Sequence, residues 1–374
     1  MSLVLNQEQR MLRDSAFAFV GENAPVAHLR RLRDGRDPIG FDPQLWRRFG
    51  ELGFAATLVP EAHDGLGLGA VEAGAIAEAL GSTLAPSPFL STAVLSARAL
   101  ALAGSAAQQA QWLPRIAAAD AVLALAVDEV SRHDPQHIAT TATPEDGGFV
   151  LQGAKTFVVD GHVAARLIVV ARVDGGGPGL FLVDPGAAGV AVERTLMVDA
   201  HNAARVRFDG MRLDASARLD GSDDAAAVLA DVLDLGRTVV AAQLLGIADE
   251  VFTRTLAYLK ERKQFDRIIG EFQALQHRMA TLYCEIEMTR ALLLRAQQAF
   301  DAEPAAAARL VAAAKAHACA TADLAVREGV QLHGGMGMTD AFDLGLFMKR
   351  ARTLQELLGD AHCHADRFAA LNHY

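Results

Sequence analysis

The chain has 374 residues and a formal net charge of −10, and 51% of its residues are hydrophobic. This length allows two or three domains, and the acidity argues against a nucleic-acid-binding protein, which needs a basic face to neutralise phosphates. The three cysteines, Cys284, Cys319 and Cys363, are too widely spaced to indicate a disulfide framework or a zinc site. We therefore expect a reduced, cytoplasmic protein with neither a signal peptide nor a membrane-spanning segment.

The first part of the chain, residues 1–118, is predicted to be a helical domain. Apolar residues recur at helical spacing over 6–22. Further helices are expected over 42–52, 70–82 and 91–104, and the last of these follows the helix-breaking sequence Pro-Ser-Pro. The connections between these segments are short, so this part should be almost entirely helical.

The middle part, residues 119–216, has the pattern of a small all-β domain. A short apolar run opens it, and β-branched residues alternate with polar ones along several short segments. The sequence Glu-Asp-Gly-Gly at 145–148 is typical of a hairpin turn between two of them. The expected strands cover 121–127, 138–143, 149–159, 167–172, 179–183 and 190–195.

The last part, residues 217–374, returns to the helical period. Long helices are expected over 225–262, 272–300, 305–332 and 344–371, with Gly236 and Gly246 as points where the first could be interrupted. Four long helices with short links are typical of an antiparallel bundle. The sequence thus predicts a mainly α protein with a central β-barrel or β-sandwich domain and a C-terminal four-helix bundle.

Several separated motifs resemble those of the acyl-CoA dehydrogenase family, over almost the whole chain. Residues 262–265 are Arg-Lys-Gln-Phe and are followed by Phe-Gln at 272–273, similar to the family's Arg-x-x-Phe-Gly … Phe-Gln motif. Residues 331–338, Gln-Leu-His-Gly-Gly-Met-Gly-Met, resemble its Gln-x-x-Gly-Gly-x-Gly segment. Val-Pro-Glu at 59–61 and Glu-Ala-Leu-Gly at 78–81 are also typical. Motifs in this order are more specific than any one alone.

In that family the first two motifs bind the adenine and pyrophosphate end of FAD, largely across a subunit interface. An arginine fork can meet the oxygens of a pyrophosphate with charge-assisted hydrogen bonds, and glycines without a Cβ let the backbone approach a ligand closely. Alone, Arg262 could equally be a solvated charge at a helix end, and Asp266 stands where the family has Gly. The resemblance implies FAD-binding roles for Arg262, Phe265, Gln273, Gln331, Gly334 and Gly335.

Acyl-CoA dehydrogenases remove the α-proton of a thioester, which needs a carboxylate within hydrogen-bonding reach. Most members carry it in a Tyr-Glu-Gly-Thr segment, and alignment of residues 352–360 puts Leu358 at the position of the Glu. A minority carry it in an Asp-Leu-Glu-Arg segment, where this chain has Gly236. The remaining weak candidate is Asp360, with Glu356 expected to face away. A capping or ion-pair role is favoured for Asp360.

The segments that contact the flavin ring in the family also depart from its pattern. Residues 128–135 read Asp-Glu-Val-Ser-Arg-His-Asp-Pro in place of Thr-Glu-Pro-Gly-Ala-Gly-Ser-Asp, and Val159 stands where a Thr would offer a hydroxyl. The missing catalytic base and the altered flavin-ring segments resemble those of the small subunits of heteromeric acyl-CoA dehydrogenases. Examples are the pimeloyl-CoA dehydrogenase small subunit and subunits from bacterial sterol side-chain degradation.

Two functions therefore stay open. The first is a self-sufficient FAD-dependent acyl-CoA dehydrogenase, active as a homo-oligomer, that passes electrons from an acyl-CoA of fatty acid or sterol degradation to an electron-transfer flavoprotein. The second is a catalytically incomplete subunit that completes the FAD site of a base-carrying partner in a heterotetramer. A helical scaffold without flavin is disfavoured by the resemblance. Residues 362–364, His-Cys-His, lack metal-ligand spacing, and no metal is expected.

Overall fold

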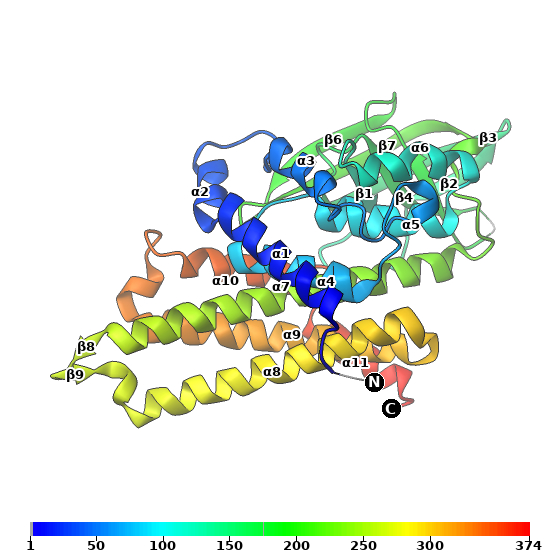
Figure 1. Ribbon diagram of the computed structural model, residues 1–374. Helices are drawn as coiled ribbons and strands as arrows, with labels where there is room; N and C mark the ends of the chain where they lie inside the picture. Colours follow the sequence, from blue (N-terminus) through cyan, green and yellow to red (C-terminus); the bar gives the residue numbers. More distant parts are fainter. Residues whose placement is uncertain (1–2, 175) are drawn as a thin grey trace. The chain divides into compact units, whose positions relative to one another are not determined.

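The computed structural model describes residues 3–174 and 176–374, and a β-sheet segment separates two helical parts of the chain (Figure 1). The predicted mainly α architecture with a central β domain is confirmed. Contacts between residues divide the chain into two compact units. The first unit contains residues up to 31, 70–85 and 237–374, and the second contains 32–69 and 86–236. The expected domain boundaries near 118 and 216 stay a prediction.

Two N-terminal helices of the first unit, α1 (Gln7–Asn23) and α4 (Ala70–Thr83), pack against each other. Helix α1 begins with a capping box, in which Asn6 and Gln9 each accept a hydrogen bond from the other's backbone amide. Helix α2 (Val26–Asp34) follows. Both packed helices lie within two residues of their predicted positions, because their apolar residues follow the helical period.

The C-terminal helices of the first unit are long and antiparallel (Figure 1). They are α7 (Ala225–Glu261), which begins in the second unit, α8 (Gln273–Ala302) and α9 (Pro304–His333). Helix α7 has no break at Gly236 or Gly246. The prediction of one helix over 344–371 is wrong, because the chain turns between α10 (Leu344–Glu356) and α11 (Ala361–Leu371). Both short helices pack against α9.

Helices α4 and α7 cross at a point where each carries a glycine. A Cβ added to Gly81 would lie 2.2 Å from the carbonyl oxygen of Gln243, and one added to Gly246 would lie 2.0 Å from that of Glu78. No side chain fits at such distances, so the two glycines set how closely the backbones approach. Glu-Ala-Leu-Gly at 78–81, singled out as a family motif, therefore has a packing reason.

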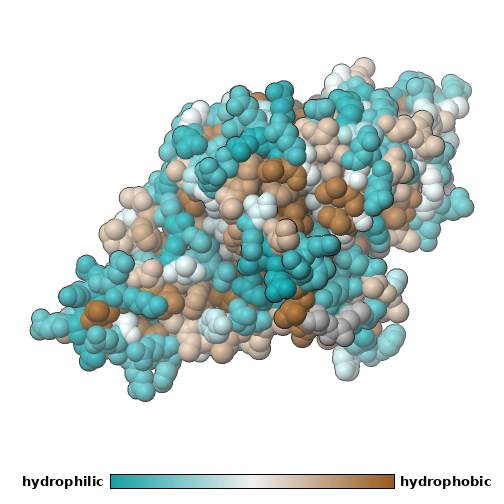
Figure 2. All heavy atoms as spheres, in the orientation of Figure 1, coloured by the Kyte–Doolittle hydropathy of each residue, from teal (hydrophilic) through white to brown (hydrophobic). Residues whose placement is uncertain are grey.

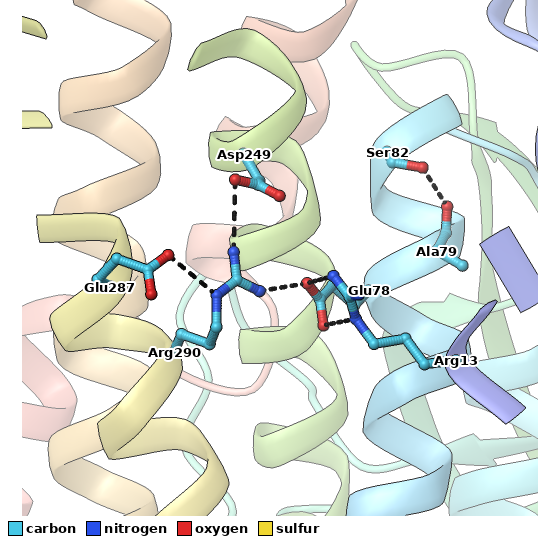
Figure 3. A network of polar contacts seen from close by, with 7 residues as sticks. All are labelled: Arg13, Glu78, Ala79, Ser82, Asp249, Glu287 and Arg290. Atoms are coloured by element: carbon cyan, nitrogen blue, oxygen red, sulfur yellow. Dashed lines mark hydrogen bonds and ion pairs between the residues drawn. The ribbon is translucent and has the colours of Figure 1, made fainter. Parts of the chain in front are cut away.

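A network of ion pairs joins four helices of the first unit (Figure 3). Arg290 of α8 lies 2.6 Å from Glu78, 3.4 Å from Asp249 and 3.2 Å from Glu287, and Glu78 also pairs with Arg13 at 3.1 Å. Burial opposes the charge of Arg290, but Glu78 and Asp249 outweigh it and raise its pKa. Burial raises the pKa of the Asp249 carboxyl. The network ties the α1–α4 pair to α7 and α8.

The helices of the second unit surround aromatic side chains. Trp46, Phe49, Phe54 and Phe89 are buried, with ring centroids 5.4–6.4 Å apart between Phe49 and the other three. The segment predicted as a helix over 91–104 is a π-helix that continues into an α-helix. The helical elements are α3 (Pro43–Glu51), η1 (Glu61–His63), η2 (Phe89–Ser96), α5 (Ala97–Ala103) and α6 (Ala106–Ala117).

The sheet of the second unit has seven strands in the order β1-β4-β2-β3-β7-β6, with β5 also paired to β4. Asp146 and Gly147, both with positive φ, form the predicted hairpin turn between β2 and β3. Strand β7 was not singled out in the sequence, although its residues alternate between buried and exposed. The strands are β1 (Leu123–Ala126), β2 (Thr141–Glu145), β3 (Gly148–Val159), β4 (Arg166–Val173), β5 (Pro178–Val183), β6 (Val190–Leu196) and β7 (Asn202–Asp214).

The remaining short elements are η3 (Ala215–Ala217), β8 (Lys263–Gln264), β9 (Arg267–Ile268), η4 (Ile269–Glu271) and η5 (Gly334–Met338). Within the part of the chain that the structure describes, no helix combines the length and the apolar character needed to cross a bilayer. In the same residues no group of three or more His, Cys, Asp or Glu side chains is arranged to hold a metal ion.

Candidate functional site

The two motifs near residues 262 and 331, far apart in sequence, lie at the same end of the helical bundle. Arg262 follows the last residue of α7, Gln273 opens α8, and Gln331 lies in the last turn of α9. The buried side chains of Leu259, Ile269, Met279 and Leu332 form one apolar cluster beneath them. This cluster fixes the ends of the three helices relative to one another, and the predicted cofactor residues lie on its exposed side.

A short β-hairpin connects α7 to α8 at this end (Figure 1). Strands β8 and β9 pair across a two-residue turn, in which Phe265 has φ 54° and Asp266 has φ 61°. Two successive positive φ angles define a type I′ turn, and Asp tolerates this conformation better than most residues other than glycine. Asp266 therefore replaces the family's Gly without changing the expected turn.

The tip of this hairpin exposes an aromatic side chain. Phe265 is 83% exposed, and its ring meets that of Phe272 edge to face at 6.2 Å between centroids. Lys263, Gln264 and Asp266 flank Phe265 in the sequence, and Figure 2 shows a mostly hydrophilic surface at the end of the bundle where the hairpin lies. Such an aromatic surface can stack on a flat ligand or insert into a neighbouring chain.

The glycine turn after α9 is the second part of this end. Gly334 has φ 60° and ψ −140°, a conformation open only to glycine. A Cβ built on Gly334 or Gly335 would meet nothing within 4 Å. His333 anchors the turn, because its Nδ1 lies 2.8 Å from the carbonyl oxygen of Gly329 and its ring stacks on Tyr258 at 4.3 Å. Burial lowers the pKa of His333.

The polar side chains at this end are free to bind a ligand. Among the described residues, no side-chain hydrogen bond or ion pair engages Arg262, Gln273 or Gln331, and all three are exposed. A guanidinium, two amides, an aromatic ring and an open glycine backbone match the donors and surfaces that an adenine with a pyrophosphate requires. These residues fit the adenine end of FAD.

The two positions of the family's catalytic base carry no acid. Leu358 is only 5% exposed, has φ 59° and follows the end of α10, and Gly236 is buried within α7. Asp360 caps α11, with its Oδ1 accepting a hydrogen bond from the Cys363 amide at 2.8 Å. Glu356 is exposed and pairs with Arg352 at 2.7 Å. Each nearby carboxylate thus has a structural role.

Three basic side chains to which the sequence assigned no role surround this position. Lys315 is completely buried, and Arg237 and His364 both contact the Leu358 carbonyl oxygen, at 3.2 and 3.0 Å. Burial, with Arg237 and Lys315 nearby, lowers the pKa of His364 to about 3. Burial lowers the pKa of Lys315. Arg237 and Lys315 therefore lie near residue 358, and the two neighbouring carboxylates that the structure describes, Glu356 and Asp360, are an ion-pair partner and a helix cap.

The segment at the position of the family's flavin-ring loop is held by a buried ion pair. Glu129 lies 2.6 Å from Lys155 and accepts hydrogen bonds from the amides of Ala139 and Thr140 at 2.7 and 2.9 Å. Lys155 also donates to the Val127 carbonyl oxygen at 2.9 Å. Burial raises the pKa of Glu129, but the bonds from Lys155 and Thr140 outweigh it and lower the pKa overall. Glu129 therefore fixes the loop through these contacts.

A groove of about 580 Å³ lies beside this loop, over strands β3, β6 and β7. Phe157 lines it, with φ 51° at an irregularity in the pairing of β3 with β7, and is 44% exposed. Val159, two residues on, offers no hydroxyl. The second unit therefore provides an aromatic surface at this groove, which the hydroxyl-bearing residues Ser131 and Thr156 also line, while position 159 carries no hydroxyl.

Three models of the acyl-CoA dehydrogenase family match the chain: the N-terminal domain over residues 6–120, the middle domain over 124–211 and the C-terminal domain over 226–370. Acyl-CoA dehydrogenase IpdE2 of Mycobacterium tuberculosis is 33% identical over 94% of this chain and 93% of its own length. The chain is similar to a chain of the ChsE4–ChsE5 complex from the same organism, with a TM-score of 0.90 and 29% identity over 99% and 98% of the two chains. A glutaryl-CoA dehydrogenase from Mycobacterium smegmatis in complex with FADH2 has the same fold, with a TM-score of 0.89 and 23% identity over 99% and 96%.

Proposed function

Because the chain belongs to the acyl-CoA dehydrogenase family, we propose that it is the base-lacking subunit of a hetero-oligomeric, FAD-dependent acyl-CoA dehydrogenase. The observation that carries this proposal is the environment of residue 358. A buried leucine occupies the base position, and the neighbouring carboxylates of Glu356 and Asp360 are an ion-pair partner and a helix cap. A leucine cannot accept a proton, so a partner's carboxylate must do so.

The contribution of this chain is to hold the adenine end of FAD. Arg262 would meet the pyrophosphate oxygens, the backbone at Gly334 and Gly335 would approach them, and Phe265 would cover the cofactor from the hairpin tip. Gln273 and Gln331 would complete the polar contacts. When bound, FAD supplies the acceptor for the hydride that leaves the β-carbon of the thioester.

A chain without the base needs a partner subunit and an acyl-CoA substrate. The partner is a second acyl-CoA dehydrogenase subunit that carries the glutamate, and the similarity to a chain of the ChsE4–ChsE5 complex supports a two-subunit assembly. The substrate is an acyl-CoA thioester of fatty acid or sterol degradation, and an electron-transfer flavoprotein accepts the electrons. A self-sufficient enzyme would need Asp360 as its base, and the hydrogen bond of that carboxylate to the Cys363 amide argues against it.

The visible absorption spectrum of the chain purified alone tests the proposal. We expect the isolated chain to retain little flavin, and a panel of acyl-CoA thioesters to leave any added FAD oxidised. Co-purification with a base-carrying subunit should give a yellow complex that one thioester reduces. A yellow isolated chain whose flavin is reduced by a thioester would contradict the proposal and direct attention to Asp360.

A further inference from the structure

The turn that carries Leu358 has a backbone conformation that leucine does not favour. Leu358 has φ 59°, and the following Gly359 has φ 103°. Only glycine adopts such angles at little cost, and a bulky residue there is held by its surroundings. No other residue fits at position 359, because a Cβ added there would lie 2.8 Å from His364 Nε2. The conformation at residue 358 therefore depends on contacts from elsewhere.

Lys315 of α9 makes most of those contacts. Its Nζ lies 3.1 Å from the carbonyl oxygen of Leu354, 3.2 Å from that of Gln355 and 2.9 Å from that of Gly359. Cys319 Sγ lies 3.3 Å from the same Nζ, and the three N–H donors of an ammonium group match the three carbonyl acceptors. The side chain is fully buried, and its charge is compensated by the carbonyls at the C-terminal end of α10, where the helix dipole is negative.

Arg237 and His364 complete the arrangement from the other side. Arg237 Nε lies 3.2 Å and His364 Nε2 lies 3.0 Å from the carbonyl oxygen of Leu358. The imidazole is neutral at physiological pH, since burial and the nearby cations hold its pKa near 3, and it donates through Nε2. The carbonyl groups of Leu354, Gln355, Leu358 and Gly359 are thus bound by three side chains, one each from α7, α9 and α11. We name these three side chains, Arg237, Lys315 and His364, the carbonyl brace.

We propose that Lys315 is a positioning residue that fixes the backbone at position 358. This chain thereby retains the backbone conformation at the position of the catalytic base, although the base itself is absent. The proposal rests on the proposed function, which places residue 358 at the base position. A hydrophobic residue that only filled space would not need a strained turn or a buried ammonium to hold it. The brace therefore holds the turn in a backbone conformation that leucine alone does not favour.

Hydrogen–deuterium exchange of the isolated chain tests this role without flavin, thioester or partner. In K315M, amides of residues 357–364 should exchange at least tenfold faster than in the wild type, while those of 262–273 should change less than twofold. The control K349M alters a half-exposed lysine on α10 and should leave both segments unchanged. Equal protection at 357–364 in K315M and the wild type, or faster exchange of the same size in both segments, would overturn the proposal.

A glycine at position 358 separates positioning from general packing. Glycine adopts φ 59° without strain, but L358G also removes a buried side chain. L358G alone is therefore the reference, and adding K315M to L358G should lower the protection at 357–364 far less than adding it to the wild type. If K315M does not fold, a folded double variant supports the proposal, whereas a double variant that does not fold while L358G alone folds overturns it. Flavin reduction by the chain alone would refute the proposed function but leave these exchange results standing, so the two can fail separately.

Discussion

The side chain of Asp360 accepts a hydrogen bond from the backbone amide of Cys363 at 2.8 Å and thereby caps helix α11. Asn caps helices as well as Asp, whereas Ala loses about 1 kcal/mol. We therefore expect D360N to keep both its stability and its turnover in a complex with a base-carrying subunit. D360A should lose about 1 kcal/mol in chemical denaturation while turnover per folded complex is retained. A base at Asp360 would instead make D360N inactive.

Replacing Arg262 should weaken FAD binding without unfolding the chain. The exposed guanidinium has no partner among the described residues, so R262M removes only contacts to the cofactor. A hydrogen bond to a charged group contributes about 1.5–3 kcal/mol, which corresponds to roughly 10- to 100-fold in affinity. Titration of the flavin-free complex with FAD measures the loss, and K263M, next in sequence and exposed, is the control. Equal affinity of R262M and K263M would contradict the assignment.

The close crossing of α4 and α7 predicts a severe effect of one added methyl group. In G246A the new Cβ would lie 2.0 Å from the Glu78 carbonyl oxygen, so the helices must separate at a cost of about 1–3 kcal/mol or more. Gly345 of α10 has nothing within 4 Å of its Cβ position, so G345A should be neutral or stabilise by up to about 1 kcal/mol. Urea denaturation of the two variants gives the comparison, and similar midpoints would refute the packing argument.

His364 predicts a dependence of stability on pH. Burial, then Arg237 and Lys315, lower its pKa to about 3 in the folded protein, below the ordinary value of about 6.5. The folded state therefore disfavours the proton, and this contribution to stability is complete above pH 6.5 and is lost as the pH falls towards 3. Relative to H364Q, the wild type should lose up to about 1.4 kcal/mol per pH unit over that range. Parallel pH profiles of the two would contradict the burial of a neutral imidazole.

The helices and most strands could be predicted because their apolar residues follow periods of 3.6 and 2. The break between α10 and α11 could not be placed, since the apolar pattern continues through Leu357 and Leu358. The local signal was Gly359 followed by Asp360, a glycine at a helix end and then a capping residue. What holds the break is Lys315, some 40 residues earlier, and no local pattern indicates such a contact.

Only part of the candidate site could be predicted from the sequence. The motifs gave Arg262, Gln331 and the glycines after α9, and the structure places them at one end of the bundle; their roles towards FAD stay predictions. Lys315 and Arg237 were not found, because a lysine or arginine in an Ala- or Leu-rich helix has the sequence signature of a solvated charge. Only the folded chain shows that both point at buried carbonyl groups.

According to the proposed function, this chain binds part of FAD but has no side chain that removes the α-proton of the thioester. Anaerobic stopped-flow measurement of flavin reduction by an acyl-CoA thioester tests it most directly, with this chain alone and in complex with a base-carrying subunit. We predict reduction only in the complex, its loss when the partner's glutamate is changed to glutamine, and no change with L358A in this chain. Reduction of FAD bound to this chain alone, or abolished turnover in D360N with the partner intact, would contradict the account.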